Sequence, residues 1–200
     1  MTDISDREKT RYNRQMMISD WGEKGQEKIK ETKALIAGVG GLGSPVSIYL
    51  AAAGVGELKI VDPDNLDLSN LNRQILYDEG DIGERKALSA AKSLRKINSD
   101  IKITPVDEKI TEKSIENIAE NCDVLVDCMD NFSGRYVLNK FAYEEGMPLF
   151  HAAVEGMDGQ ATTIIPSETP CLKCVFPNSP PSTKVPVLGA TPGLLGSIQA

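Results

Sequence analysis

Residues 33–62 are KALIAGVGGLGSPVSIYLAAAGVGELKIVD, and this stretch decides the fold. Residues 33–38 form a short apolar run that ends in glycine, which is typical of a buried β-strand. Residues 42–53 form an apolar helix with Pro45 near its first turn, where a missing N–H costs nothing. Residues 57–62 form a second strand. The stretch therefore predicts a β–α–β unit with a glycine loop between the first strand and the helix.

The rest of the chain continues this alternation of strands and helices. We expect helices at residues 6–17, 23–30, 84–98, 111–121 and 133–145, and strands at residues 101–106, 122–128 and 148–151. Residues 159–166 are an antiparallel extension, residues 171–186 a proline-rich loop, and a helix opens at residues 193–200. We predict an α/β fold, a Rossmann-like, doubly wound, mostly parallel sheet with helices on both faces.

Two helices carry more detailed expectations. In the helix at residues 84–98, one apolar face is expected to consist of Ala87, Leu88, Ala91 and Leu94. Thr111 is placed to cap the helix at residues 111–121.

Length and composition limit the class of protein. Two hundred residues with 40% hydrophobic content suit one domain with a proper core. The formal net charge of −7 gives no general attraction to nucleic acid or to an anionic membrane. No apolar signal segment opens the chain and no apolar run is long enough to span a bilayer, so we expect a cytoplasmic protein. Four cysteines are too few for a disulfide scaffold.

The glycine loop indicates a nucleotide. Gly38, Gly40, Gly41 and Gly43 form G-x-G-x-x-G between a strand and a helix, so backbone N–H groups and the helix N-terminus can approach a phosphate. Asp62 ends the second strand, where a carboxylate can accept hydrogen bonds from ribose hydroxyls. By itself, the motif suits NAD, FAD, SAM and ATP alike.

The polar segments that follow favour a chain of phosphates and a metal. Arg73 is the only cation of residues 64–74, and Lys86 lies in the first turn of a helix, where a cation is misplaced unless an anion binds. An arginine and a lysine together suit the β- and γ-phosphates of a nucleoside triphosphate. Asp130 and Asn131 follow the strand at residues 122–128, at the sheet edge where such folds bind ligands. A carboxylate there is well placed to hold Mg²⁺.

Five motifs together carry a family resemblance. They are R-x-x-R-Q (residues 11–15), GVGGLGS (38–44), SNLNRQ (69–74), DIGERKA (81–87) and DNFSGR (130–135). This set resembles the ThiF/MoeB/HesA family, which is related to the ubiquitin-activating enzymes. The resemblance implies an ATP-dependent adenylyltransferase that activates the C-terminal glycine carboxylate of a ubiquitin-like sulfur-carrier protein of MoaD or ThiS type. The product would be an acyl-adenylate, with release of pyrophosphate.

The resemblance also implies roles for individual residues and an organisation of the chain. It implies one adenylation domain, with a helical arm at residues 1–32, a nucleotide-binding core at residues 33–166 and a C-terminal loop and helix at residues 167–200. Arg14 would reach the site across a homodimer interface, and Asp130 would serve Mg²⁺. The remaining nucleotide-binding residues would be the four glycines of the loop, Asp62, Asp64, Asn70, Arg73, Gln74, Lys86 and Asn131. The catalytic residues would be Arg14, Arg73, Lys86 and Asp130.

Three features limit the resemblance or leave alternatives open. Cys171 and Cys174 form C-x-x-C, half of a zinc tetrathiolate whose second half relatives carry further on, or else a redox pair or bare thiols. Ser182 stands where many relatives carry a thiol, so we expect adenylation without a covalent thiol-linked carrier. His151, the only histidine, is either structural or faces the carrier.

Other functions also stay open. A NAD-dependent oxidoreductase would use the glycine loop and Asp62, but it leaves Arg73, Lys86 and Asp130 without a role. A non-catalytic scaffold of the same family would be expected to have lost phosphate or metal residues, and all of them are present. Activation of a tRNA or small-peptide carboxylate is a further variant, and the negative charge argues against tRNA. The pathway, whether molybdopterin, thiamine or another thiolation, is not indicated.

Overall fold

One six-stranded sheet forms the centre of the molecule. The computed structural model describes residues 3–178 and 185–200, so Ser182 lies outside the described residues. The strands are β1 (Lys33–Ala37), β2 (Glu57–Val61), β3 (Lys102–Val106), β4 (Val124–Asp127), β5 (Leu149–Glu155) and β6 (Asp158–Ile164). Their order is β3-β2-β1-β4-β5-β6, and all neighbouring pairs are parallel except β5 and β6. The predicted fold class, including the antiparallel extension, is confirmed.

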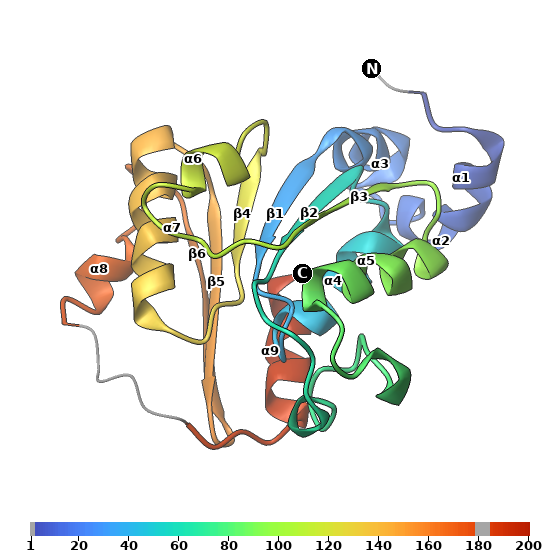
Figure 1. Cartoon of the computed structure of the whole chain (residues 1–200). Coiled ribbons are helices and arrows are strands. Elements are labelled where there is room, and N and C mark those ends of the chain that lie inside the picture. The colour runs from blue at the N-terminus through green and yellow to red at the C-terminus, as the bar shows by residue number, and fades with distance from the viewer. Residues whose placement is uncertain (1–2, 179–184) are drawn as a thin grey trace.

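Helices cover both faces of this sheet (Figure 1). On one face, α4 (Gly43–Ala53), α5 (Lys86–Ile97) and α9 (Ala190–Gln199) pack over Ile36, Ile60 and Ala152. On the other face, α6 (Ile115–Ile118), α7 (Phe132–Glu145) and α8 (Leu172–Val175) pack over Leu35, Leu125 and Leu149. Successive strand residues alternate between these two apolar clusters, because side chains of a strand point to opposite faces.

The N-terminal residues form a separate helical arm. It consists of α1 (Asp6–Arg11), α2 (Asn13–Met16) and α3 (Gly22–Glu31). Ser5 and Glu8 form a capping box that starts α1, and the buried Glu8 carboxylate accepts a hydrogen bond from Lys30 of α3 at 2.8 Å. The first helix of the arm is thereby attached to α3, which leads into β1.

Several predicted details are wrong. Leu88 is 42% exposed, and Ala90 completes the buried face of α5 instead. The helix expected at residues 111–121 is the single turn α6. It is preceded by a turn in which Thr111 and Ser114 bond to one another, so Thr111 does not cap it. The proline-rich loop contains the short helix α8, and the last helix begins at Ala190 rather than Gly193.

The parallel strands all run toward the lower edge of the sheet in Figure 1, where the segments that follow β1, β2 and β4 meet. Chain connections leave β1 and β4 in opposite directions across the sheet, and this reversal is where doubly wound sheets bind ligands. Among the described residues, no helix combines the length and apolar character needed to cross a bilayer.

Candidate nucleotide site

The glycine loop lies between β1 and α4, directly beside the turn that follows β4. Gly38 adopts φ of +92°, which glycine reaches readily, and a Cβ there would lie 2.9 Å from the Cys128 carbonyl oxygen. A Cβ on Gly43 would lie only 2.0 Å from the Gly38 oxygen. These two glycines are therefore required by close packing of the loop, the helix and the β4 turn.

Gly40 and Gly41 have a different environment. A Cβ on Gly40 would lie 3.5 Å from Nε2 of Gln74, and a Cβ on Gly41 would lie 3.5 Å from Cγ of Arg73. The Gly40 distance is an ordinary van der Waals contact, so packing does not demand glycine there. A Cβ on Gly41 would also lie 3.3 Å from Cγ of Pro192, which is a tight contact. The backbone of these two glycines therefore lies close to the side chains of Gln74 and Arg73.

The backbone of Gly40 and Gly41 and the side chains of Arg73 and Gln74 form a cradle, and Gln74 is the member that most strongly indicates a ligand. It is 4% exposed, and within the described part of the chain its Oε1 has no hydrogen-bond partner. A buried, unpaired amide oxygen costs about 1–3 kcal/mol. An amide held in this state beside a glycine loop is suited to a ligand that supplies the missing donor.

Asp62 holds the loop in shape. Its Oδ2 accepts a hydrogen bond from the Val39 amide and its Oδ1 accepts one from the Asp64 amide, each at 3.0 Å. Burial raises the pKa of the Asp62 carboxyl, although Lys86 and the two amides act to lower it. Tyr77, which the sequence did not single out, donates to the Val39 carbonyl oxygen at 2.9 Å and closes the loop from the other side.

Lys86 lies in the first turn of α5, as predicted, and its side chain is buried, although its charge suggests exposure. Its Nζ lies 3.1 Å from Oδ2 of Asp64, whose side chain is 66% exposed. This ion pair explains how a cation is tolerated at a helix N-terminus. Arg73 is half-buried and donates to the Ser69 carbonyl oxygen and to Oδ1 of Asn72, each at 2.9 Å.

The side chains of Asn70 and Asn131 are hydrogen-bonded to nearby backbone amides. Oδ1 of Asn70 accepts a hydrogen bond from the Asp67 amide at 3.0 Å and stabilises the turn before Arg73. Oδ1 of Asn131 caps α7 by accepting from the Gly134 amide at 2.9 Å. The Asn131 amide also donates to the exposed Asp130 carboxylate at 3.1 Å. Asp130 lies two residues beyond Cys128, whose carbonyl oxygen borders Gly38.

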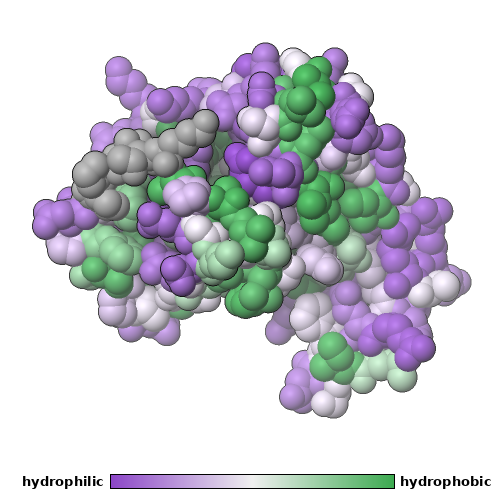
Figure 2. Space-filling view, turned by 90° about the horizontal axis from the view of Figure 1, so that it is seen from below, coloured by the Kyte–Doolittle hydropathy of each residue, from purple (hydrophilic) through white to green (hydrophobic). Residues whose placement is uncertain are grey.

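The surface around the site mixes polar and apolar groups. Figure 2 shows this edge of the sheet end-on, with hydrophobic side chains gathered beside hydrophilic ones. The segments at this edge of the sheet expose large apolar side chains, namely Leu68, Ile75, Met157, Leu188 and Leu194. Such an apolar rim is suited to protein contact.

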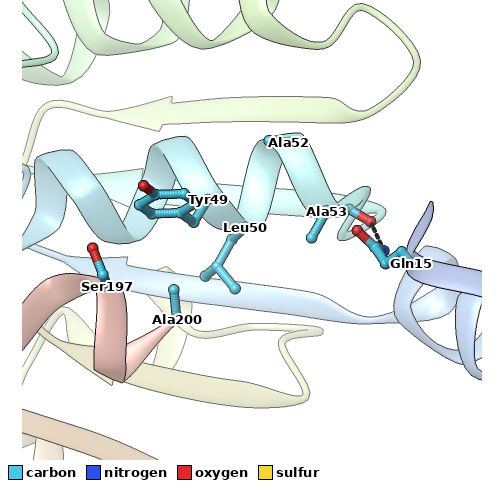
Figure 3. Close-up of a pocket in the computed structure, with 7 residues that line it drawn as sticks. All are labelled: Gln15, Tyr49, Leu50, Ala52, Ala53, Ser197 and Ala200. Atoms are coloured by element: carbon cyan, nitrogen blue, oxygen red, sulfur yellow. Dashed lines mark hydrogen bonds between the residues drawn. The ribbon is translucent and has the colours of Figure 1, made fainter. Parts of the chain in front are cut away.

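Arg14 is not part of this cluster. Gln15, its neighbour in α2, donates to the Ala53 carbonyl oxygen at 2.8 Å, at the C-terminal end of α4. Figure 3 shows Gln15 at that end of the helix, beside a cavity of about 300 Å³ between α4 and α9. Since α4 rises about 1.5 Å per residue, its 11 residues place the arm roughly 16 Å from the glycine loop.

The two C-x-x-C cysteines lie on the opposite face, at α8. Their sulfur atoms are 3.5 Å apart, and α8 is attached to α7 by a hydrogen bond from the Leu172 amide to Asn139. Partial burial raises the pKa of the Cys171 thiol, but hydrogen bonds from Cys174 and Asn139 outweigh it and lower that pKa. Within the described ranges, no cluster of three or more His, Cys, Asp or Glu side chains is arranged to hold a metal.

His151 is structural in position. It is 1% exposed, and its Nδ1 lies 2.6 Å from Oδ2 of Asp127. Sequence analysis did not single out Asp127 or the buried Arg135, although Arg135 lies within the DNFSGR motif. Nothing in the sequence pattern distinguishes such buried polar residues from exposed ones.

Comparison with known proteins agrees with this geometry. The sequence pattern of the ThiF family matches residues 12–200. The chain is 41% identical to the SAMP-activating enzyme E1 of Haloferax volcanii over 95% of this chain and 72% of that protein. It is 40% identical to the adenylyltransferase and sulfurtransferase MOCS3 of Xenopus laevis, over 95% of this chain but only 44% of that protein.

Solved structures share the fold. E. coli MccB with MccA-N7isoASN superimposes with a TM-score of 0.81 at 24% identity, over 94% of this chain and 62% of MccB. E. coli tRNA N6-threonylcarbamoyladenosine dehydratase in complex with ATP gives a TM-score of 0.69 at 26% identity, over 74% of this chain and 60% of that one. On the sequence match, the relatives and the glycine-loop geometry together, this chain belongs to the ThiF family.

Proposed function

We propose that this chain transfers AMP from ATP to the C-terminal glycine carboxylate of a ubiquitin-like sulfur-carrier protein, with release of pyrophosphate. The class of enzyme, an adenylyltransferase, rests on the family and on relatives that carry this name. The carrier rests on the names of the relatives and on the apolar rim around the site. A cytoplasmic location and one adenylation domain over residues 1–200 belong to the same proposal.

One observation carries the nucleotide assignment. The backbone of Gly40 and Gly41 is bordered by Gln74, whose buried Oε1 has no partner in the described structure, and by Arg73. The phosphate oxygens of a nucleoside triphosphate would accept from backbone N–H groups and from cations. A hydroxyl or amino group of the nucleotide would donate to Oε1 of Gln74. Family structures solved with ATP support the same ligand.

The residues suit this chemistry without a general base. A carboxylate is already ionised at neutral pH, so the catalytic demand is to position it in line with the α-phosphorus and to neutralise phosphate charge. In this proposal Lys86, which pairs with Asp64, and Arg73, which lies beside Gly41, neutralise the phosphates. Asp62, which already holds the loop, would also hold the ribose. Asp130 fits Mg²⁺, because it is an exposed carboxylate at the same edge of the sheet. Bound Mg²⁺ would neutralise phosphate charge.

We also propose a homodimer in which Arg14 serves the partner's site. The glycine loop of the same protomer is too distant for Arg14 to reach. Helices α4 and α9 expose Tyr49, Leu194 and Ile198, which could form the interface. For Cys171 and Cys174 we propose half of a zinc site, since sulfur atoms 3.5 Å apart suit two corners of a tetrahedron.

The first test is a thermal shift with Mg·ATP, Mg·ADP, NAD and no ligand. A ligand at 100 times its Kd adds about 2.7 kcal/mol to stability. We expect a rise of several degrees with Mg·ATP and none with NAD, followed by ATP–pyrophosphate exchange that depends on a glycine-ended carrier. A rise with NAD alone would replace this proposal with an oxidoreductase, and Mg·ATP binding without exchange would favour a scaffold.

A further inference from the structure

The turn that follows β4 (residues 127–131, hereafter the Asp127 turn) is held in place from its buried side. Oδ1 of Asp127 accepts a hydrogen bond from the Met129 amide at 3.0 Å. The Met129 carbonyl oxygen accepts two hydrogen bonds from the Arg135 guanidinium, at 2.7 and 3.1 Å. Two residues later, Asn131 caps α7. The exposed Asp130 thus sits on a turn whose backbone is fixed on both sides of it.

Asp127 depends in turn on His151. The two residues are register partners on the neighbouring strands β4 and β5, so their side chains share one face of the sheet. Oδ2 of Asp127 lies 2.6 Å from Nδ1 of His151, and the two side chains are 0% and 1% exposed. The residues one step back on this face are Leu125 and Leu149, both in the apolar cluster under α7. A carboxylate in such surroundings needs a donor on each oxygen.

Stability alone does not account for this pair. A buried carboxylate–imidazole pair adds little net stability compared with apolar side chains of similar size. The arrangement also leaves Nε2 of His151 buried and, among the described residues, without a hydrogen-bond partner, which is a further cost. An apolar pair at these two register positions would avoid both costs, but it would leave the Met129 amide without its acceptor.

We propose that His151 and Asp127 are a positioning pair that holds the Asp127 turn, and through it the Asp130 carboxylate, in place for Mg·ATP. His151 orients the Asp127 carboxylate with one oxygen toward the Met129 amide, and neither residue touches the nucleotide. The fixed turn is a property of the free chain, whereas the effect on Mg²⁺ rests on the function proposed above.

The test compares His151→Leu, which removes the donor to Asp127, with His151→Asn, whose amide nitrogen lies near the position of Nδ1. Leu149→Ala is the matched control, because it creates a cavity on the same face of β5 without touching the carboxylate. Two quantities are measured on the whole chain. They are hydrogen exchange of the amides of residues 128–131 without ligand, and the Mg²⁺ concentration that half-saturates ATP binding in an equilibrium titration.

We expect His151→Leu to speed exchange of the Met129 amide about tenfold relative to the rest of the sheet. We expect it to raise the half-saturating Mg²⁺ concentration roughly tenfold, the lower end for a residue that orients a metal ligand from behind. ATP binding in the presence of a chelator should not change. His151→Asn should restore both quantities.

Unchanged exchange and Mg²⁺ requirement in His151→Leu would overturn the proposal, as would equal shifts in Leu149→Ala. If His151→Leu does not fold, His151→Gln replaces it, because the longer side chain of Gln puts its amide nitrogen away from the position of Nδ1. Equal behaviour of the Asn and Gln variants would then overturn the proposal. If the wild-type chain does not bind Mg·ATP, the proposed function fails, whereas the exchange measurement still decides whether the pair fixes the turn.

Discussion

At the scale of single residues, the glycines of the loop divide into two kinds, and alanine substitutions separate them. Gly40→Ala places a methyl group 3.5 Å from Gln74, so the fold should tolerate it while the phosphate cradle is filled. We expect a melting temperature within a few degrees of wild type and loss of the Mg·ATP shift. Gly43→Ala places a methyl group 2.0 Å from the Gly38 oxygen. Such overpacking costs about 1–3 kcal/mol or more, so we expect a clearly lower melting temperature.

Thermal melts of both variants, with and without Mg·ATP, check this contrast. Full nucleotide binding by a folded Gly40→Ala chain would place the phosphates elsewhere.

A second prediction at the scale of single residues concerns Lys86. In Lys86→Ala, the largely solvated Asp64 carboxylate loses its partner, the buried Asp62 carboxylate loses a nearby cation, and a buried side chain is removed. The loss of stability should therefore be about 1–2 kcal/mol. Loss of one preorganised charge at the reacting phosphates should slow adenylyl transfer roughly 10²- to 10³-fold. ATP–pyrophosphate exchange measures the rate, and denaturant unfolding measures the stability.

Lys92→Ala is the control for Lys86→Ala, because Lys92 lies on the same helix and pairs at the surface with Glu84 at 3.8 Å. A large fall in the melting temperature of Lys86→Ala, with the exchange rate intact, would make Lys86 a structural residue only.

At the scale of elements, Glu8 attaches the N-terminal arm. Burial acts to raise the pKa of Glu8, but hydrogen bonds from Lys30 and Ser5 outweigh it and hold the pKa below its ordinary value of 4.5. A carboxyl with a lowered folded-state pKa stabilises the fold above its unfolded-state pKa, and this stabilisation is lost as the pH falls through the folded-state pKa. Glu8→Gln should therefore lose about 1–2 kcal/mol at pH 7, and the difference from wild type should be clearly smaller at about pH 3, below the unfolded-state pKa.

Denaturant titrations at the two pH values check the Glu8 prediction. Lys9→Ala on the same helix removes only an exposed pair with Glu23 and serves as the control. A deficit in Glu8→Gln that stays constant down to pH 3 would mean that packing, not charge, attaches the arm.

The elements that sequence predicted well are those with a long, simple pattern. The strand–loop–helix of residues 33–62 and the helix α7 combine apolar periodicity with glycine or asparagine at their ends, and the structure has them within two residues. Prediction failed where tertiary contacts override local preference. Residues 111–121 have helical periodicity, but Asn121 adopts φ of +60° and the chain turns into β4 after a single helical turn. Leu88 has the right spacing for the core, but it faces solvent on α5.

The residues of the candidate site could also be predicted from the sequence only in part. Residues 38–43, Asp62 and residues 69–74 could be placed from the sequence, since glycine spacing and the carboxyl ends of parallel strands bring them together. Burial could not be foreseen for Lys86, since its charge suggests exposure and only its pairing with Asp64 makes burial tolerable. The pair of Asp127 and His151 joins residues 24 positions apart, and only strand register aligns them.

At the scale of the whole molecule, Arg14 and Lys86 can be tested together. In the proposed homodimer each site combines Lys86 of one protomer with Arg14 of the other. Arg14→Ala and Lys86→Ala should each leave at most about a hundredth of the wild-type rate of ATP–pyrophosphate exchange. A mixture refolded together should recover about a quarter of the wild-type rate, because half of the dimers hold one intact site.

Exchange activity and light scattering of the mixture measure this recovery. A mixture of two preparations of Arg14→Ala is the control. Failure to recover in a dimeric mixture would place Arg14 in its own protomer's site or outside catalysis.

The fixed length of α4 also matters for the whole molecule. Its first turn carries Gly43, and its last carbonyl groups are capped from elsewhere, since the Ala53 oxygen accepts from Gln15 and Gln26 and the Ala51 oxygen accepts from Asn98. The helix is therefore a rigid spacer between the glycine loop and the arm, and in the proposed homodimer its length would count twice. Inserting or deleting one residue would rotate the far end by about 100° and shift it by about 1.5 Å at each site. Natural variants of this chain should accordingly gain and lose residues in their loops while keeping α4 at 11 residues.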